Sequence, residues 1–163
     1  MARIAPTSWA ARPVVGYGMA FISAGFSKGA VFAVKLGGSG VLDPAQAIAW
    51  EIKKAAPNKP SLLLIDELLY FFNDGGIATC AEAKTGNVLW SERFGGNCSA
   101  SPIYADGRIY MGNEEGKLTV FAPGREYKVL AENKFADGFM SSPAVSGHAL
   151  YLRTRTNLYR VEN

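Results

Sequence analysis

The sequence predicts an all-β fold, a β-propeller of four-stranded antiparallel blades, because one spacing recurs four times in its 163 residues. A unit of about 40–50 residues that is rich in short strands is typical of propeller blades. In each of four pairs the second residue comes twelve positions after the first: Met1 and Pro13, Trp50 and Leu62, Trp90 and Pro102, and Ala131 and Pro143. An aromatic residue follows the second member of every pair after eight residues: Phe21, Tyr70, Tyr110 and Tyr151.

The four copies predict a single domain, since they follow one another at offsets of 49, 40 and 41 residues. A chain of this length can bury a core of its own. Propellers contain about 4–8 blades, so four repeats could close as a four-bladed ring or form half of an eight-bladed ring. The approximate boundaries of the repeats are 1–46, 47–87, 88–127 and 128–163.

The third repeat shows the plan of one blade most clearly. Short turns separate its strands, and Gly107 suits the first turn because glycine adopts positive φ without strain. Short apolar strands joined in this way form an antiparallel meander. The expected strands lie at residues 101–104, 108–112, 117–121 and about 128–134.

The second repeat follows the same plan, with Gly86 at the position of its last hairpin turn where a Cβ would strain the backbone. Its expected strands lie at residues 62–65, 68–72, 77–81 and 88–94.

The first and last repeats depart from this plan. A glycine-rich stretch, residues 36–43, enlarges one loop of the first repeat. The run from Pro44 to Lys54 has the composition of a helix, but the repeat register predicts that its second half is a strand. The fourth repeat contains only three strands, at about 142–145, 149–153 and 157–161.

The strand that the fourth repeat lacks is assigned to the N-terminus. Counting back twelve residues from Pro13 places Met1, Ala2, Arg3, Ile4 and Ala5 in register with the outer strands. We expect this ring-closing segment to complete the last blade, because an unpaired edge strand invites aggregation. It would pair with residues 157–161 of its own chain in a four-bladed monomer. In an eight-bladed ring it would pair with those residues of a second copy, which predicts a homodimer of twice the 17.5 kDa chain mass.

Large aromatic residues are expected to hold neighbouring blades together. Trp50 and Trp90 fall on outer strands at equivalent positions, where each ring should be largely buried against the next blade. The repeated tyrosines Tyr70, Tyr110 and Tyr151 are assigned the same blade-packing role.

Residues 83–90, the pair Ser101-Pro102 with residues 105–110, and residues 115–118 resemble the repeats of pyrroloquinoline-quinone-like β-propellers. The resemblance covers essentially the whole chain, and the tryptophan-bearing outer strand is its most specific part. It implies an eight-bladed propeller that is typically exported in bacteria. Some relatives are quinoprotein dehydrogenases, and many others are binding scaffolds, such as the propeller lipoprotein of outer-membrane protein assembly. Four repeats are half of the family's number.

The residues do not support catalysis. The quinone-dependent relatives carry adjacent cysteines, acidic calcium ligands and a catalytic aspartate, whereas Cys80 and Cys98 lie eighteen residues apart and are expected to be small buried residues. No acidic cluster has the spacing of a calcium loop. His148, the only histidine, is predicted in a turn, and a zinc site or a serine triad needs further partners. We therefore predict no catalytic residue, no metal and no cofactor.

Composition and charge limit the kinds of partner that the chain is expected to bind. A net charge of +3 with mixed signs is too mild to indicate nucleic acid, and no apolar run is long enough to span a membrane. The densest basic group, Arg153, Arg155 and Arg160, could hold an anionic partner or form a solvated strand face. The N-terminus lacks a signal-peptide pattern, so the chain as written is expected in the cytoplasm; a piece of a longer protein of this family would be exported.

The function predicted from the sequence is a non-catalytic propeller module that binds a protein or another ligand through its loops or sheet edges. The alternative is a fragment of a quinoprotein-like dehydrogenase, or of another propeller enzyme, whose site requires further sequence.

Overall fold

The computed structural model describes residues 11–24 and 29–162, and the expected ring-closing segment Met1 to Ala5 lies outside them. The first two sheets contain β1 (Val14–Gly16), β2 (Met19–Ala24), β3 (Ala30–Lys35), β4 (Ile48–Ile52), β5 (Leu63–Ile65), β6 (Leu68–Phe72), β7 (Ile77–Glu82) and β8 (Val88–Arg93). The other two contain β9 (Ile103–Ala105), β10 (Arg108–Gly112), β11 (Lys117–Phe121), β12 (Val129–Lys134), β13 (Ala144–Ser146), β14 (Ala149–Arg153) and β15 (Leu158–Val161).

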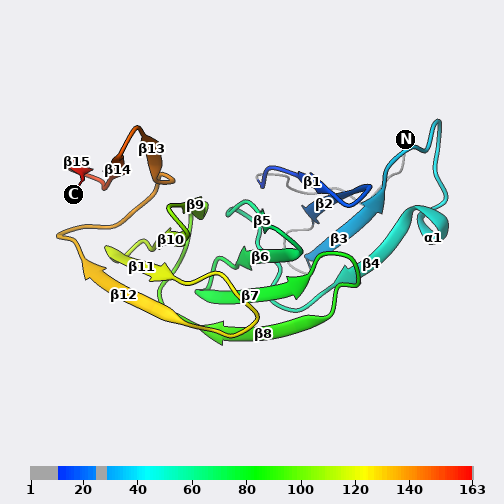
Figure 1. Ribbon diagram of the computed structural model, residues 1–163, viewed down its shortest axis with the longest axis horizontal. Helices are drawn as coiled ribbons and strands as arrows, with labels where there is room; N and C mark the ends of the chain where they lie inside the picture. Colours follow the sequence, from blue (N-terminus) through cyan, green and yellow to red (C-terminus); the bar gives the residue numbers. More distant parts are fainter. Residues whose placement is uncertain (1–10, 25–28, 163) are drawn as a thin grey trace.

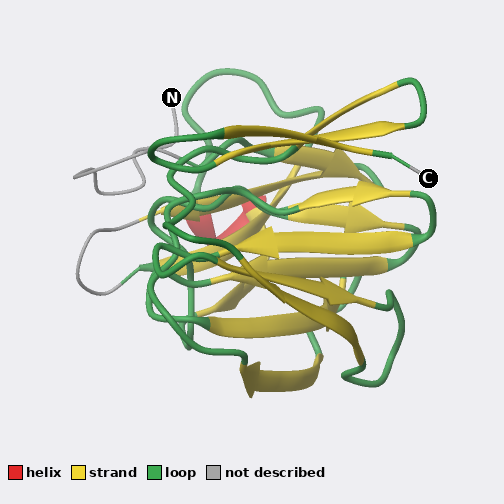
Figure 2. Ribbon diagram, turned by 90° about the vertical axis from the view of Figure 1, so that its left-hand side faces the viewer, coloured by secondary structure: helices red, strands yellow, loops and turns green. Residues whose placement is uncertain are grey.

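Each sheet is an antiparallel meander in chain order, which confirms the predicted all-β propeller fold. We call the sheets β1–β4, β5–β8, β9–β12 and β13–β15 blades 1 to 4. Figure 1 shows them side by side in an open arc, with β5 and β9 on the inner side and β8 and β12 on the outer rim. The connecting loops gather at the two ends of the strands (Figure 2). Among the described residues the arc does not close into a four-bladed ring.

The expected repeats and the observed blades differ by one strand in phase. Each of the last three repeats counted from the twelve-residue spacing contributes its first strand to the outer edge of one blade and its other strands to the next blade. The repeat 47–87, for example, holds β4 of blade 1 and then β5, β6 and β7 of blade 2.

The outer strands share one register. Trp50 lies opposite Ala33, and Trp90 lies opposite Cys80 at the equivalent position of blade 2. Ala131 takes this position in blade 3. In all three blades the register shifts directly after this pair, so the bulge is a repeated feature of the outer hairpin.

The run Pro44 to Lys54 combines a turn of helix with a strand. Helix α1 (Pro44–Ala47) begins after Asp43, whose side chain accepts a hydrogen bond from the amide of Ala45. Proline at the first helical position favours this start. The second half is strand β4, as the repeat register predicts.

The core lies between the blades and forms three clusters. The cluster between blades 1 and 2 includes Phe21 and Phe71, and the cluster between blades 2 and 3 includes Tyr70, Phe72 and Phe121. The cluster between blades 3 and 4 is smaller, with a fully buried centre of Leu118, Phe139 and Leu152. Blade 4 is therefore held by fewer buried side chains than its neighbours.

Candidate functional site

Trp50 joins blade 1 to blade 2. Its indole Nε1 donates a hydrogen bond to the carbonyl oxygen of Ala83 at 3.0 Å. The ring lies on the last hairpin turn of blade 2, where a Cβ added to Gly86 would come within 2.7 Å of indole Cδ2. Gly86 also has a φ of +74°, so both the turn and the tryptophan require glycine there.

Trp90 makes the equivalent contact between blades 2 and 3. Its Nε1 donates to the carbonyl oxygen of Gly124 at 3.3 Å, and its ring centroid lies 5.2 Å from that of Tyr127. Both tryptophans pack against the core clusters and keep part of their surface in solvent, because the outer strands form the rim of the arc. Arg125, next to Gly124, adds an ion pair with Glu82 of blade 2.

The three repeated tyrosines lie in different surroundings. Tyr70 is fully buried, its hydroxyl accepts a hydrogen bond from the amide of Gly124 at 2.7 Å, and burial raises its pKa above the ordinary value. Tyr110 is partly buried against blade 4. Tyr151 is partly buried on the side of blade 4 that faces away from blade 3. Tyr70 is therefore enclosed between two blades, whereas Tyr151 lies on a side of blade 4 that no other described blade covers.

A series of serine hydroxyls links the blades along one end of the inner strands. The amide of Arg12 donates to Ser61 Oγ, the amide of Ser61 donates to Ser101 Oγ, and the amide of Ser101 donates to Ser142 Oγ, each at 2.9 Å. These residues directly precede Pro13, Leu62, Pro102 and Pro143. They therefore recur at the repeat interval and could be recognised from the sequence. Because these amides bond to the next blade, the inner strands begin later than the sequence indicated.

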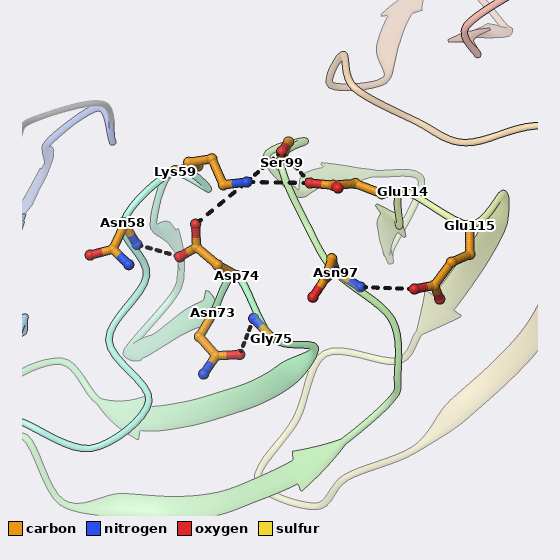
Figure 3. A network of polar contacts seen from close by, with 9 residues as sticks. All are labelled: Asn58, Lys59, Asn73, Asp74, Gly75, Asn97, Ser99, Glu114 and Glu115. Atoms are coloured by element: carbon orange, nitrogen blue, oxygen red, sulfur yellow. Dashed lines mark hydrogen bonds and ion pairs between the residues drawn. The ribbon is translucent and has the colours of Figure 1, made fainter. Parts of the chain in front are cut away.

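A polar network crosses the loops of blades 2 and 3 at this end (Figure 3). Lys59 Nζ lies 2.8 Å from Ser99 Oγ, 3.3 Å from Glu114 and 3.9 Å from Asp74. Asp74 also accepts a hydrogen bond from the amide of Asn58 at 2.7 Å. The lysine therefore bridges the turns after β6 and β10 and positions the two connectors that carry the chain from blade to blade.

This network predicts an acid-sensitive contribution to stability. The hydroxyl of Ser99, followed by the ammonium group of Lys59, lowers the pKa of Glu114. A carboxyl group with a lowered pKa stabilises the fold above its ordinary pKa of about 4.3, and this contribution disappears as the pH falls through the folded-state value. Urea midpoints measured from pH 7 to pH 3 should therefore fall less steeply for Glu114→Gln than for the unmodified protein. Glu126→Gln, an exposed site without such partners, should keep the original slope.

The side chains that could act as nucleophiles, bases or metal ligands are dispersed over the structure. Cys80 and Cys98 are buried free thiols, and burial raises the pKa of each to about 12, so neither is a thiolate near neutral pH. His148 lies in the turn between β13 and β14. The described residues contain no group of three metal-ligating side chains, and no helix within them is long and apolar enough to cross a membrane.

The basic residues of blade 4 lie on its surface. Arg153, Arg155 and Arg160 are all exposed, and Arg160 pairs with Glu162 at 2.7 Å. They form part of a solvated blade surface at the end of the arc.

The free side of blade 1 is apolar. Met19 and Phe21 pack toward blade 2, so the alternating residues Ala20 and Ile22 point away from it. In β3, Phe32 and Val34 lie opposite Ile22 and Ala20 and share this side. All four are partly exposed, whereas their counterparts in blade 2 are buried to 2% exposure or less: Leu69, Phe71, Thr79 and Ala81.

The free end of blade 4 is a strand edge. Among the described residues, β15 pairs only with β14, whereas the third strand of every other blade pairs with a fourth. Leu158 on this strand is 72% exposed. The two ends of the arc thus offer an apolar blade face and an unpaired edge.

The repeated outer tryptophans, the interblade hydrogen bonds and the four meanders define a β-propeller of pyrroloquinoline-quinone-like repeats. A family model described as outer membrane protein assembly factor BamB matches residues 40–126 and 58–163. The chain belongs to this family. No curated protein sequence matches it.

Solved structures show the same fold at low sequence identity. BamB from Moraxella catarrhalis superposes with a TM-score of 0.68 at 14% identity, over 89% of this chain and 43% of that one. The computationally designed Ika4 protein gives 0.77 at 11% identity, over 99% and 95%. A europium-containing methanol dehydrogenase gives 0.59 at 13% identity, over 75% and 24%. The chain thus spans less than half the length of BamB from M. catarrhalis.

Proposed function

We propose that the protein is a non-catalytic propeller scaffold that works as a half-ring and closes by pairing with a second copy of itself. The observation that carries the proposal is the apolar free side of blade 1. Ala20, Ile22, Phe32 and Val34 occupy positions that an adjoining blade covers in blades 2 and 3. A blade from a second copy would bury them in the same way.

The other end of the arc supplies a matching surface. Tyr151 lies on the side of blade 4 that faces away from blade 3, where Phe21 and Tyr70 of the other blades contact their neighbours. In the proposed dimer Tyr151 packs against Ile22 and Phe32 of the second copy. A strand of that copy beside Leu158–Val161 would remove the unpaired edge.

The extent of the structural matches fits this assembly. The chain corresponds to nearly the whole of Ika4 but to less than half of BamB from M. catarrhalis. Two seams, each burying a blade face and a strand, would place the dimer among obligate interfaces of more than about 2,000 Å². The completed ring would bind a protein partner through its loops, as expected for a scaffold of this family.

Light scattering after size exclusion tests the assembly. The purified chain should elute as a species of twice 17.5 kDa at micromolar concentration. Ile22→Asp should shift it to the monomer, because an unpaired carboxylate buried in an apolar seam costs several kcal/mol. Val41→Asp, in a loop residue that is 83% exposed, should leave the dimer intact.

A stable 17.5 kDa species of the unmodified chain would contradict the proposal. Circular dichroism separates dissociation from unfolding, since a dissociated Ile22→Asp chain keeps the β-sheet signal. Phe32→Ser offers a second disruption of the same face. If both variants stay folded and dimeric, the interface lies elsewhere.

A further inference from the structure

A cleft of about 760 Å³ opens between blades 3 and 4. Arg108 and Tyr110 of β10 line one side, and Leu150, Val161 and the turn residue His148 line the other. Its volume is within the range of small-molecule sites, about 300–1,000 Å³.

The equivalent space between blades 2 and 3 is filled. There Tyr70 packs against Trp90 with ring centroids 6.0 Å apart, and Phe121 of blade 3 packs against Tyr127 at 5.9 Å. Leu68 belongs to the same buried cluster. This interface shows which side chains the space accommodates when the chain itself supplies them.

Three register-equivalent residues differ between the two interfaces. Ala131 stands where blade 2 has Trp90, and Val161 of blade 4 stands where blade 3 has Phe121. These two changes remove both large aromatic groups from the space, while Tyr110 remains at the position of Tyr70. The cleft therefore keeps an aromatic wall and lacks the ring that packs against it.

The third difference brings a charge into the cleft. Arg108 stands where blade 2 has the buried Leu68. One guanidinium nitrogen, Nη1, donates to Asp106 at 2.9 Å, and the side chain is 49% exposed. Guanidinium has five N–H donors in a planar fork that matches a carboxylate, so donors remain for a ligand.

Both carboxylates that line the cleft are ion-paired with an arginine. Asp106 pairs with Arg108, and Glu162 pairs with Arg160 at 2.7 Å. Asp106 has the same backbone conformation as Asp66 of blade 2, with φ of +47° in both, so the turn accounts for it. Arg108 is the charged lining residue that the repeat does not account for.

We propose that this cleft binds an aromatic carboxylate, with the ring between Tyr110 and the Leu150–Val161 side and the carboxylate on Arg108. The ring takes the place that Trp90 and Phe121 occupy in the neighbouring interface. The inference is independent of dimer formation, because every lining residue named belongs to blades 3 and 4 of one chain.

Isothermal titration with N-acetyl-L-tryptophan tests the proposal, with N-acetyl-L-tryptophanamide as the uncharged counterpart. The acid should bind about tenfold more tightly than the amide, a difference of about 1.4 kcal/mol. Arg108→Gln should remove this preference, whereas Lys128→Gln, an exposed charge elsewhere on blade 3, should keep it. Equal affinity for acid and amide, or no saturable binding at millimolar ligand, overturns the proposal.

Ala131→Trp provides a second test that does not depend on the arginine. The new indole should lie beside Tyr110 as Trp90 lies beside Tyr70, so it should fill the cleft and abolish binding while the protein stays folded. Undiminished binding to this folded variant would place the ligand elsewhere and overturn the assignment. A tetrapeptide with a C-terminal tryptophan identifies the source of the ligand: binding as tight as the free acid indicates a protein C-terminus, and weaker binding indicates a small metabolite.

Discussion

Trp90→Ala should lower the free energy of unfolding by about 3 kcal/mol, the lower end of the range for large aromatic residues in cores. The substitution removes the ring contacts with Tyr70 and Tyr127 and the hydrogen bond to Gly124. The lower end applies because Trp90 keeps part of its surface in solvent. Urea denaturation followed by circular dichroism measures the loss directly. In a domain of this size the midpoint of thermal unfolding should fall by about 6–12 °C.

Two further substitutions separate packing from other effects. Trp90→Phe keeps an aromatic ring but loses the indole N–H, so it should cost about 1 kcal/mol for the hydrogen bond plus a smaller packing loss. Val88→Ala changes a residue that is 48% exposed on the same strand and should cost about 0.5 kcal/mol or less. If Trp90→Ala is as stable as Val88→Ala, the tryptophan does not hold blades 2 and 3 together.

Gly138→Ala should destabilise the protein by about 3 kcal/mol or more, at the upper end of overpacking effects. A Cβ added at this position would lie 1.8 Å from the carbonyl oxygen of Glu114 and 2.4 Å from its carbonyl carbon. Both are backbone atoms, which a rotamer change cannot move. The connector would have to shift, which breaks the hydrogen bond from the amide of Phe139 to Asn113 and exposes the buried Phe139 ring.

The effect should be greatest in blade 4, because Phe139 is at the centre of the small cluster between blades 3 and 4. Hydrogen exchange of the β14 amides should accelerate more than that of the β6 amides. Gly75→Ala is the matched control, since the nearest atom to its added Cβ is Asn73 Oδ1 at an ordinary 3.7 Å. Native stability in Gly138→Ala would show that the two loops are not in close backbone contact.

Much of the fold could be predicted because the chain repeats one plan. The spacing from Trp50 to Leu62 and from Trp90 to Pro102 places the outer strands, and β4 confirms that this register outweighs the helical composition of Pro44 to Lys54. A single turn of helix still forms at α1, because Asp43 and Pro44 supply local start signals that a long-range period does not reveal.

The interactions between blades could be predicted only in part. A large indole on a rim strand indicates contact with a neighbour, but its acceptor is a backbone carbonyl, at Ala83 or Gly124, that any sequence would provide. The serines Ser61, Ser101 and Ser142 recur at the repeat interval, yet their donors are amides of the preceding blade. Lys59 lies on the connector between blades 1 and 2. The equivalent position on the connector after blade 2 is Ser99, so the repeat period does not predict a lysine there.

The sequence alone determined the kind of fold, the strands and the positions that face a neighbouring blade, because short-range alternation and a fixed period encode them directly. Tertiary structure decided how the blades meet. It showed that the described residues form an open arc, that the free side of blade 1 keeps apolar side chains partly exposed, and that a cleft lined by Arg108, Tyr110 and Val161 lies between blades 3 and 4. These features arise where side chains from different blades occupy the same space. Which side chains meet there, and with what combined volume and charge, is fixed only once the chain has folded.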